Sequence, residues 1–299
     1  MLANTVVLGA VVLVLGCRGD EPAREPRSVT APIVTADAAI ARINPMPPCT
    51  GCEPSRIATL PTNRGTGLAL AGTVAYVSTF FDDAIYRVAL DGSAAPVVLY
   101  HSPGANLGDV EVHGDELRWS SNATGRIYSA PVSGVGPVTV LADALPGIWG
   151  FASDDAWIYW ADFGGSSPGA IWRRPLRGGP SVRIADDPRS TVADHALIDG
   201  DQIMYTDQSA RLMRVPVTGG TPEAWIEVGG DEAFSGISAD ATHYYASTLS
   251  GNHVLRIDRT TRSVEIVATD PAAPSRVAVD ASHVYWVDYT PVEVWSRTK

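Results

Sequence analysis

Two stretches of this sequence are nearly identical: Tyr159-Trp160-Ala161-Asp162 and Tyr285-Trp286-Val287-Asp288. Looser versions of them recur along the chain, each with a large aromatic side chain at the second position. These positions, about 40 to 45 residues apart, are Tyr76, Trp119, Trp160, Tyr205, Tyr245 and Trp286. A period of this length, built from several short strands, is typical of a β-propeller. Six repeats therefore predict six blades.

The residues around each aromatic predict four strands per repeat. Two positions after the aromatic stands a short side chain with an oxygen atom: Ser78, Ser121, Asp162, Asp207, Ser247 or Asp288. An apolar-x-polar step about ten residues after the aromatic, such as Ile85-Tyr86-Arg87, predicts the third strand. Hairpin signals such as Asp91-Gly92 follow, where a positive φ costs little, and then an outer strand. We expect each blade to be a four-stranded antiparallel sheet.

The two ends of the repeat region complement each other. The sixth repeat stops at Lys299 before it reaches an outer strand, whereas Arg56-Ile57-Ala58-Thr59-Leu60 precedes the first repeat and alternates like one. We expect this segment to complete the last blade, because closure of the ring removes exposed sheet edges. The predicted fold is all-β: a six-bladed propeller over residues 55–299, closed by an N-terminal strand in the last blade.

The repeat resembles the YWTD repeat of LDL-receptor-type six-bladed propellers, over about residues 55–299. In that family the Asp is structural, so the resemblance implies that Asp162, Asp207 and Asp288 stabilise the ring. Blades one, two and five have Ser instead of this Asp. The broader TolB-like and NHL-type propellers are therefore equally compatible relatives.

The N-terminus reads as an export signal. Residues 5–16 form an apolar run too short to cross a bilayer, and Val14-Leu15-Gly16-Cys17 resembles a bacterial lipobox. The resemblance implies a signal peptide over residues 1–16, a lipid on Cys17 and a location in the cell envelope, either periplasmic or at the outer-membrane surface. Met1–Asn4 contains no basic residue, so an upstream start, an uncleaved hydrophobic tail and secretion with unmodified Cys17 remain alternatives.

The segment over residues 17–54 reads as a linker. It is rich in Pro, Ala and charged residues and has no sustained strand or helix period, which predicts disorder. Cys49 and Cys52 lie within it, and outside the cytoplasm a pair this close is expected to form a disulfide. A haem site is excluded because Glu53 follows the second cysteine where a histidine would be required.

Composition and net charge limit the classes of molecule that this protein is expected to bind. Apolar residues make up 45% and charged residues 18%, as in a globular domain. The net charge is −11 and Lys299 is the only lysine, which argues against nucleic acid and against any membrane contact beyond the lipid anchor. We expect a monomer that binds an unidentified small molecule, glycan or protein.

A ligand site is expected at the mouth of the central channel, on the face reached by loops that lead from each outer strand to the next inner strand. Alignment of the inner strands gives the candidate ligand-binding residues: Arg64, Asn106, Asp109, Trp149, Asp194, His195, Phe234 and Arg276. The plainer interpretation is that these side chains bond one another in a watery channel. The glycines aligned with them, Gly67, Gly150 and Gly236, fit crowding near the axis.

An enzyme is the alternative function. Gluconolactonase-like six-bladed enzymes use a metal at the channel mouth, held by carboxylates and an amide, and Asp109, Asp194 and Asn106 could imitate that cage with His195 as base. Calcium would be the metal in that case. No nucleophile motif or paired-histidine motif supports it. We therefore assign no catalytic residue, metal ligand or cofactor, and predict a binding protein with a metal-dependent lactonase or other hydrolase as the alternative.

Overall fold

The computed structural model describes residues 40–45, 51–145, 147–162, 169–187, 194–207, 209–230, 232–270 and 272–299. They belong to one compact unit, residues 38–299. The predicted signal peptide, Cys17 and Cys49 lie outside the described residues, while Cys52 is disulfide-bonded. In the described part, no helix is long and apolar enough to cross a membrane.

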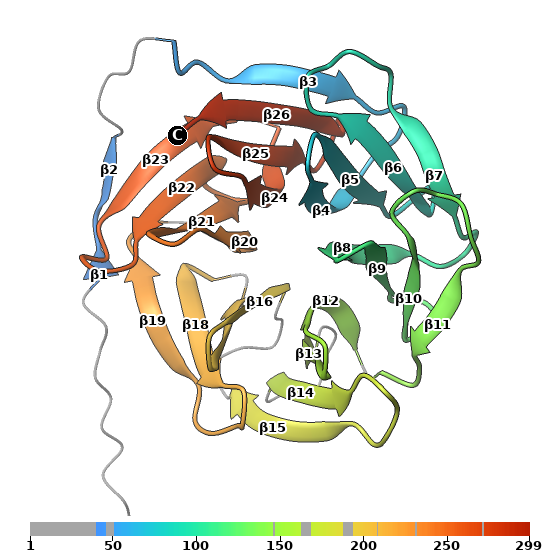
Figure 1. The fold of residues 1–299 in the computed structure, drawn as a ribbon. Helices are drawn as coiled ribbons and strands as arrows, with labels where there is room; N and C mark the ends of the chain where they lie inside the picture. Colours follow the sequence, from blue (N-terminus) through green and yellow to red (C-terminus); the bar gives the residue numbers. More distant parts are fainter. Residues whose placement is uncertain are drawn as a thin grey trace, which may run out of the picture. The chain divides into compact units, whose positions relative to one another are not determined.

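Six antiparallel sheets stand around one axis (Figure 1), and each runs from an inner to an outer strand. Blade 1 contains β4 (Gly65–Ala71), β5 (Val74–Thr79), β6 (Ala84–Ala89) and β7 (Val97–His101). Blade 2 contains β8 (Leu107–His113), β9 (Glu116–Ser121), β10 (Arg126–Pro131) and β11 (Thr139–Ala142). Blade 3 contains β12 (Ile148–Ser153), β13 (Trp157–Asp162), β14 (Gly169–Pro175) and β15 (Val182–Asp187).

The second half of the chain repeats this arrangement. Blade 4 contains β16 (His195–Asp199), β17 (Gln202–Thr206), β18 (Arg211–Pro216) and β19 (Glu223–Val228). Blade 5 contains β20 (Phe234–Ala239), β21 (His243–Thr248), β22 (His253–Asp258) and β23 (Val264–Thr269). Blade 6 contains β24 (Pro274–Val279), β25 (His283–Asp288), β26 (Glu293–Thr298) and, from the other end of the chain, β3 (Ser55–Thr59). The predicted six-bladed propeller is confirmed.

Strand β3 closes the ring as the sequence predicts. It pairs antiparallel with β26, with Ala58 opposite Val294. Beyond the strand, the Leu60 amide donates to the Val292 carbonyl at 2.9 Å. Leu60 is buried in a hydrophobic cluster that contains side chains of both blade 6 and blade 1. The first and last blades are therefore joined by backbone pairing and by a shared core.

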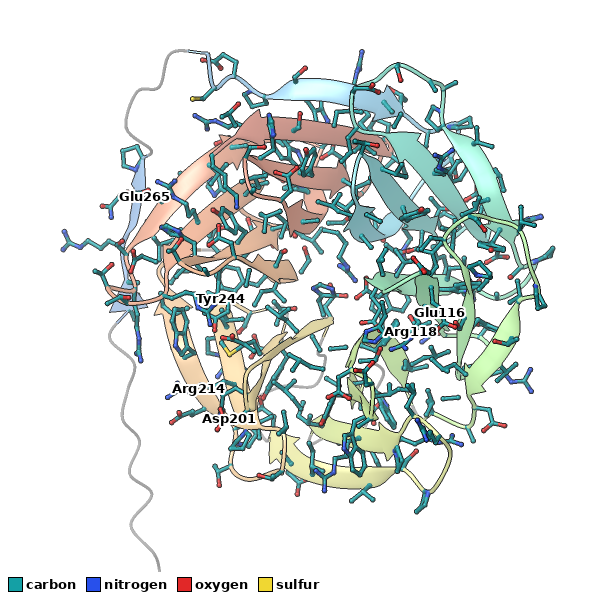
Figure 2. The ribbon with its side chains drawn as sticks, in the orientation of Figure 1. Glu116, Arg118, Asp201, Arg214, Tyr244 and Glu265 are labelled. Carbon is teal, nitrogen blue, oxygen red and sulfur yellow. The ribbon has the colours of Figure 1, made fainter. Side chains whose placement is uncertain are left out.

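The core lies between the blades. The six aromatic repeat positions all fall on second strands, and each is at most 3% exposed. In the described residues the buried apolar side chains form six clusters, each shared by two neighbouring blades. Figure 2 shows side chains filling the spaces between sheets, with the labelled Arg214 toward the rim. Arg214 forms an ion pair with Glu223. Each sheet thus buries both faces against its neighbours.

Hydroxyl groups near the second and first strands tie neighbouring blades together close to the axis. The Ser78 hydroxyl donates to the Gly108 carbonyl of the next blade at 2.7 Å, and Ser120 donates to the Trp149 carbonyl in the same way. Thr206 donates to Ser235 at 3.3 Å. Ser275 joins blade 6 to blade 1 by donating to the Gly65 carbonyl at 2.9 Å. These bonds satisfy carbonyls that would otherwise be buried without a partner.

Two short strands fall in the segment predicted to be a disordered linker. β1 (Ile40–Ala41) pairs parallel with β19, and β2 (Ile43–Pro45) pairs parallel with β23. Each adds a fifth strand to the outer edge of a blade. These five residues form strands and not the expected disordered chain, because the unpaired edges of blades 4 and 5 supply hydrogen bonds that a local sequence pattern does not reveal.

Replacement of Leu60 by Ala tests the contribution of closure. The side chain is 2% exposed in the cluster that joins blades 6 and 1. We expect Leu60→Ala to lower the free energy of unfolding by about 2–5 kcal/mol. Urea denaturation of Leu60→Ala and of Val98→Ala, whose side chain is 48% exposed on an outer strand, provides the comparison. Equal stabilities of the two variants would show that the closing segment adds nothing to the ring.

Candidate functional site

One equivalent position on each inner strand decides what occupies the axis. Around the ring this position alternates between a glycine and an ionisable side chain: Gly67, Asp109, Gly150, His195, Gly236 and Arg276. The three ionisable side chains come from blades 2, 4 and 6, which are not neighbours. Because His195 and Arg276 both reach Asp109, at 2.7 and 3.9 Å, they must cross the axis. We call Asp109, Asp194, His195 and Arg276 the axial plug.

The glycines are required by the close approach of neighbouring inner strands. A Cβ atom on Gly150 would lie 2.1 Å from the Asp194 carbonyl oxygen, and one on Gly236 would lie 2.8 Å from the Arg276 Cα. Both contacts are with backbone, which cannot rotate away. The glycines of the odd blades thus make room for the backbone that carries the plug, in agreement with the crowding expected from the sequence.

His195 is held at both ring nitrogens. The Ile237 amide donates to Nδ1 at 2.9 Å, so the imidazole proton is on Nε2 and points to the Asp109 carboxylate 2.7 Å away. Asp109 is 2% exposed and also accepts the Val110 amide at 2.9 Å. The lone pair that a general base would use is therefore engaged within the protein.

Arg276 is the most connected member of the plug. It is 3% exposed and donates to the Asp194 carboxylate at 3.0 Å and to the Ser275 carbonyl at 2.8 Å. A further donor contact reaches the Ser235 carbonyl at 3.3 Å. Its Nε makes no hydrogen bond. Two carboxylates, those of Asp194 and Asp109, thus stand around one buried guanidinium, as the burial of a charge requires.

A pocket of about 270 Å³ lies on the side of the plug where the inner strands begin. We call it the mouth pocket. It is lined by Arg64, Gly65, Thr66, Trp149, Asp194, Leu249, Ala273, Ser275, Arg276 and Tyr289. The plug forms its floor through Arg276 and Asp194, and aromatic side chains form part of its wall. Four of the eight predicted ligand-binding residues, namely Arg64, Trp149, Asp194 and Arg276, meet here.

Arg64 enters this pocket from a tightly held loop. Its backbone has a left-handed φ of 65°, its amide donates to the Tyr289 carbonyl at 2.9 Å, and its carbonyl accepts the Phe80 amide at 3.0 Å. The guanidinium consequently lies among aromatic rings: its carbon is 4.0 Å from the centre of Phe80, 5.3 Å from Trp149 and 5.5 Å from Tyr289. These are cation–π distances.

The Arg64 guanidinium has no anionic partner in the described part of the chain. Its side chain makes neither a hydrogen bond nor an ion pair there, and its Nε is buried without a partner. Aromatic faces attract a cation but accept no conventional hydrogen bonds from its N–H groups. Arg64 therefore brings unused donor capacity and one positive charge to the mouth pocket.

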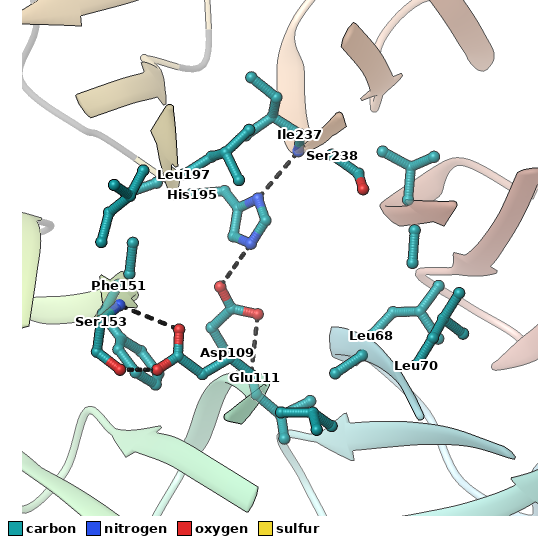
Figure 3. A pocket seen from close by; sticks show the side chains of 18 of the residues that line it. Leu68, Leu70, Asp109, Glu111, Phe151, Ser153, His195, Leu197, Ile237 and Ser238 are labelled. Carbon is teal, nitrogen blue, oxygen red and sulfur yellow. Dashed lines mark hydrogen bonds and ion pairs between the residues drawn. The ribbon is translucent and has the colours of Figure 1, made fainter. Parts of the chain in front are cut away.

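A second cavity, of about 330 Å³, lies on the other side of the plug. Figure 3 shows its polar wall, where Asp109 meets His195 and where Glu111 accepts the Ser153 amide at 3.1 Å and the Ser153 hydroxyl. The rest of the wall is largely apolar, with Leu68, Leu70 and Leu197 among its residues. Burial raises the pKa of Glu111 to about 8. Asp109 and His195 line this cavity and not the mouth pocket.

Two predicted site residues line neither cavity. Phe234 is fully buried in the cluster between blades 4 and 5, because its side chain turns away from the axis. Asn106 adopts a φ of 49° in the loop before β8, where its amide donates to Asp83 at 2.7 Å. For these two residues the predicted placement at the mouth differs from the structure.

Sequence reasoning missed three residues near the mouth. Phe80, Leu249 and Tyr289 directly follow the second strands β5, β21 and β25. Phe80 stacks on Arg64, and the other two line the pocket. The prediction considered only loops that enter inner strands, whereas the loops that leave second strands reach the same face. A bulky residue three or four positions after the repeat aromatic was the available signal.

The three repeat aspartates lie apart from both cavities. Asp288 is fully buried and accepts the Trp295 indole N–H at 2.8 Å, and Asp207 accepts hydrogen bonds from Arg211 and Ser209. Asp162 ends β13 and is partly buried. Burial, followed by the neighbouring Asp270 carboxylate, raises the pKa of Asp288 to about 8. Asp207 bonds within its own blade, whereas Asp288 contacts both Trp295 of blade 6 and Asp270 at the end of blade 5.

The enzyme alternative would use Asp109, Asp194 and Asn106 as metal ligands. In the structure the two carboxylates are engaged with His195 and Arg276, and the Asn106 backbone amide donates to Asp83. Among the residues that the structure describes, no group of three or more His, Cys, Asp or Glu side chains is arranged to hold a metal ion.

The structure resembles six-bladed propellers of several activities. It aligns with a gluconolactonase from Xanthomonas campestris at 14% identity and a TM-score of 0.68, over 83% of this chain and 90% of that one. A virginiamycin B lyase from Staphylococcus aureus aligns at 12% identity and 0.59, over 83% and 99%. A chain of a nidogen/laminin complex aligns at 18% identity and 0.56, over 70% and 87%. No family model matches the sequence, and no curated protein matches it. These similarities establish the fold.

Replacement of Gly150 by Ala should destabilise the ring. The new methyl group would meet the Asp194 and His195 backbone at 2.1 and 2.7 Å, so neighbouring inner strands must separate. We expect a loss of about 1–3 kcal/mol in unfolding free energy, measured by urea denaturation. Gly229→Ala is the matched control, because its methyl group would make an ordinary 3.4 Å contact with Ile40. A Gly150→Ala variant as stable as the control would contradict the crowding described above.

Asp288 should make stability depend on pH. Since its pKa is near 8 in the folded protein and near 4 when unfolded, the folded state holds an extra proton between these values. The contribution of Asp288 to the free energy of unfolding is fully present below about pH 4 and is lost as the pH rises through about 8. In Asp288→Asn, the side-chain amide oxygen still accepts the Trp295 N–H but no longer titrates. The plot of unfolding free energy against pH should therefore lose a slope of up to about 1.4 kcal/mol per pH unit.

Urea denaturation between pH 5 and 8 measures that slope. Glu111 contributes in the same direction, so the variant should be less pH-dependent than the parent without being flat. Asp201→Asn, at an exposed turn, is the control. An unchanged slope in Asp288→Asn would show that the carboxyl group is ionised in the folded protein.

Proposed function

We propose that this protein is a non-catalytic binding propeller that takes a small organic molecule into the mouth pocket. The supporting observation is the composition of that pocket. Trp149 and Tyr289 offer flat apolar surfaces, while Arg64 and the floor of the plug offer polar groups at fixed positions. Its volume of about 270 Å³ is near the lower end of the range for small-molecule sites.

The plug favours binding over chemistry. A hydrolase needs a base with an available lone pair, and both nitrogens of His195 are already bonded. A calcium-dependent lactonase needs several free oxygen ligands directed at one point, but Asp109 and Asp194 are used to hold His195 and Arg276. The similarity to a gluconolactonase keeps the lactonase as the alternative for the same face of the fold.

We further propose that the propeller is displayed at the bacterial cell envelope. A lipid on Cys17 would hold it at the membrane, and the residues after Cys17 would separate the lipid from the first strands. Display in this way suits capture of a ligand from the surrounding compartment. It also fits the disulfide at Cys52, since disulfides persist in oxidising compartments.

Indole is a suitable probe for the pocket, because it is flat, uncharged and small. We expect it to bind weakly, and Trp149→Leu to reduce its affinity about three- to tenfold through loss of an aromatic wall. Isothermal titration calorimetry and ligand-observed NMR would measure this. Trp225→Leu is the matched control, because Trp225 is 6% exposed, compared with 5% for Trp149, but lies between blades 4 and 5.

Addition of calcium in a thermal-shift assay separates the two functions. The binding proposal expects no rise in melting temperature with millimolar calcium, whereas a lactonase with a calcium site would be stabilised by mass action. Indole affinity that is the same in Trp149→Leu and in the parent would contradict the mouth pocket as the site.

A further inference from the structure

We infer that the ligand of the mouth pocket is a planar monocarboxylate, whose carboxylate pairs with Arg64. This inference rests on the proposed function and names the ligand class. The observation behind it is the unpaired guanidinium of Arg64. In the described part of the chain, Arg64 is a cation at the mouth with no carboxylate within ion-pair distance, while the second cation there, Arg276, has two.

The aromatic surroundings leave only some directions open to the Arg64 side chain. Phe80 covers the guanidinium at 4.0 Å, and Trp149 and Tyr289 lie 5.3 and 5.5 Å from it. A guanidinium covered by rings keeps its N–H donors at its edge, where a carboxylate can accept two parallel hydrogen bonds.

The charge of the lining favours a single negative charge. The charged side chains that line the pocket are Arg64, Arg276 and Asp194, and Asp194 is 3.0 Å from Arg276. Arg64 is thus the one charged lining residue without a counter-ion among the described residues, and Asp109, 3.9 Å from Arg276, adds a second negative charge behind the floor. A dianion such as phosphate would bring an extra negative charge close to Asp194, which is 4% exposed and poorly screened. A monoanion matches the pocket.

The shape of the lining favours a flat body behind the carboxylate. Trp149 is buried at the pocket wall and lies 5.6 Å from Phe80 with its ring tilted by 35°. Tyr289 belongs to the same wall. Leu249 and Ala273 supply the remaining apolar surface. A planar ring can contact these faces while its carboxylate reaches Arg64.

The overall charge of −11 opposes the approach of any anion from a distance. Its influence is short at physiological salt, where the Debye length is about 8 Å. The partly buried Arg64 acts within that length. The inference should therefore be tested at about 0.15 M salt, where local contacts dominate.

The experiment compares indole with indole-3-carboxylate by calorimetry on the intact chain. In the parent protein we expect the carboxylate to bind at least tenfold more tightly than indole, as is usual for a hydrogen-bonded charge pair. Arg64→Gln should abolish this difference, so that indole and indole-3-carboxylate bind the variant with equal affinity. Arg64→Lys keeps the charge and loses the planar fork, so it should retain part of the difference.

Arg262→Gln is a closely matched control. Arg262 also has a left-handed backbone, with φ of 59°, and its guanidinium also lies over a tryptophan, 5.2 Å from Trp225. It belongs to the outer groove beside β1 and not to the mouth pocket. Its replacement should leave the affinities for both compounds unchanged.

The outcomes separate the inference from the proposed function. Equal affinity of the parent for indole and indole-3-carboxylate would overturn the inference while the pocket remains a binding site. Displacement of indole-3-carboxylate by an equal concentration of inorganic phosphate would overturn the preference for a monocarboxylate. Absence of binding by both indole compounds would overturn the proposed function and the inference together.

Discussion

Every sheet in this protein depends on its two neighbours to cover its apolar faces. In the described residues the buried side chains form clusters between blades, such as the one that joins Tyr205 of blade 4 to Ala152 of blade 3. A single blade has no core of its own, so its stability comes from the interfaces it shares. A ring satisfies all six sheets only when it closes, which is why the pairing of β3 with β26 matters to blades far from it.

Closure also determines what can occupy the axis. Packed blades bring the inner strands so close that a methyl group at Gly150 or Gly236 would overlap the neighbouring backbone. Large side chains are accommodated only where the flanking blades carry glycine. Asp109, His195 and Arg276 use this space and bind one another, which separates the mouth pocket from the cavity on the other side of the plug. The candidate site is therefore a product of ring geometry as much as of the residues that line it.

Much of this fold could be predicted from the sequence because the same local pattern occurs six times along the chain. The aromatic at the second strand, the short oxygen-bearing residue and the hairpin glycines fixed the blade count and the closing strand. Strands β1 and β2 could not be predicted, because they form only where blades 4 and 5 offer unpaired edges. Their own residues show no alternation. Local sequence patterns predict local structure, whereas each of these two strands depends on a partner strand that is distant in sequence.

The site was predictable in position but only partly in composition. Alignment of inner strands brought together the residues that form the plug, since the repeat places them at equivalent depths, although Asp109 and His195 do not line the mouth pocket. It failed for Phe234, whose strand position gives no information on whether the ring faces the axis or the next blade. It also missed Phe80 and Tyr289, because their approach to Arg64 arises from backbone hydrogen bonds that join the loop before β4 to the residues that follow β5 and β25.

The closing strand also imposes an order in time. Arg56 of β3 and Glu293 of β26 are 237 positions apart, so β3, which precedes the first blade in the chain, must wait for a strand of the last blade to be synthesised. Contacts of such long range are slow to form, because most of the chain's freedom is lost before they are gained. Until then the first blade and the last blade each present a bare apolar face. An incomplete chain would carry both faces unprotected, which makes truncation and premature release the events most apt to lead this protein into aggregation.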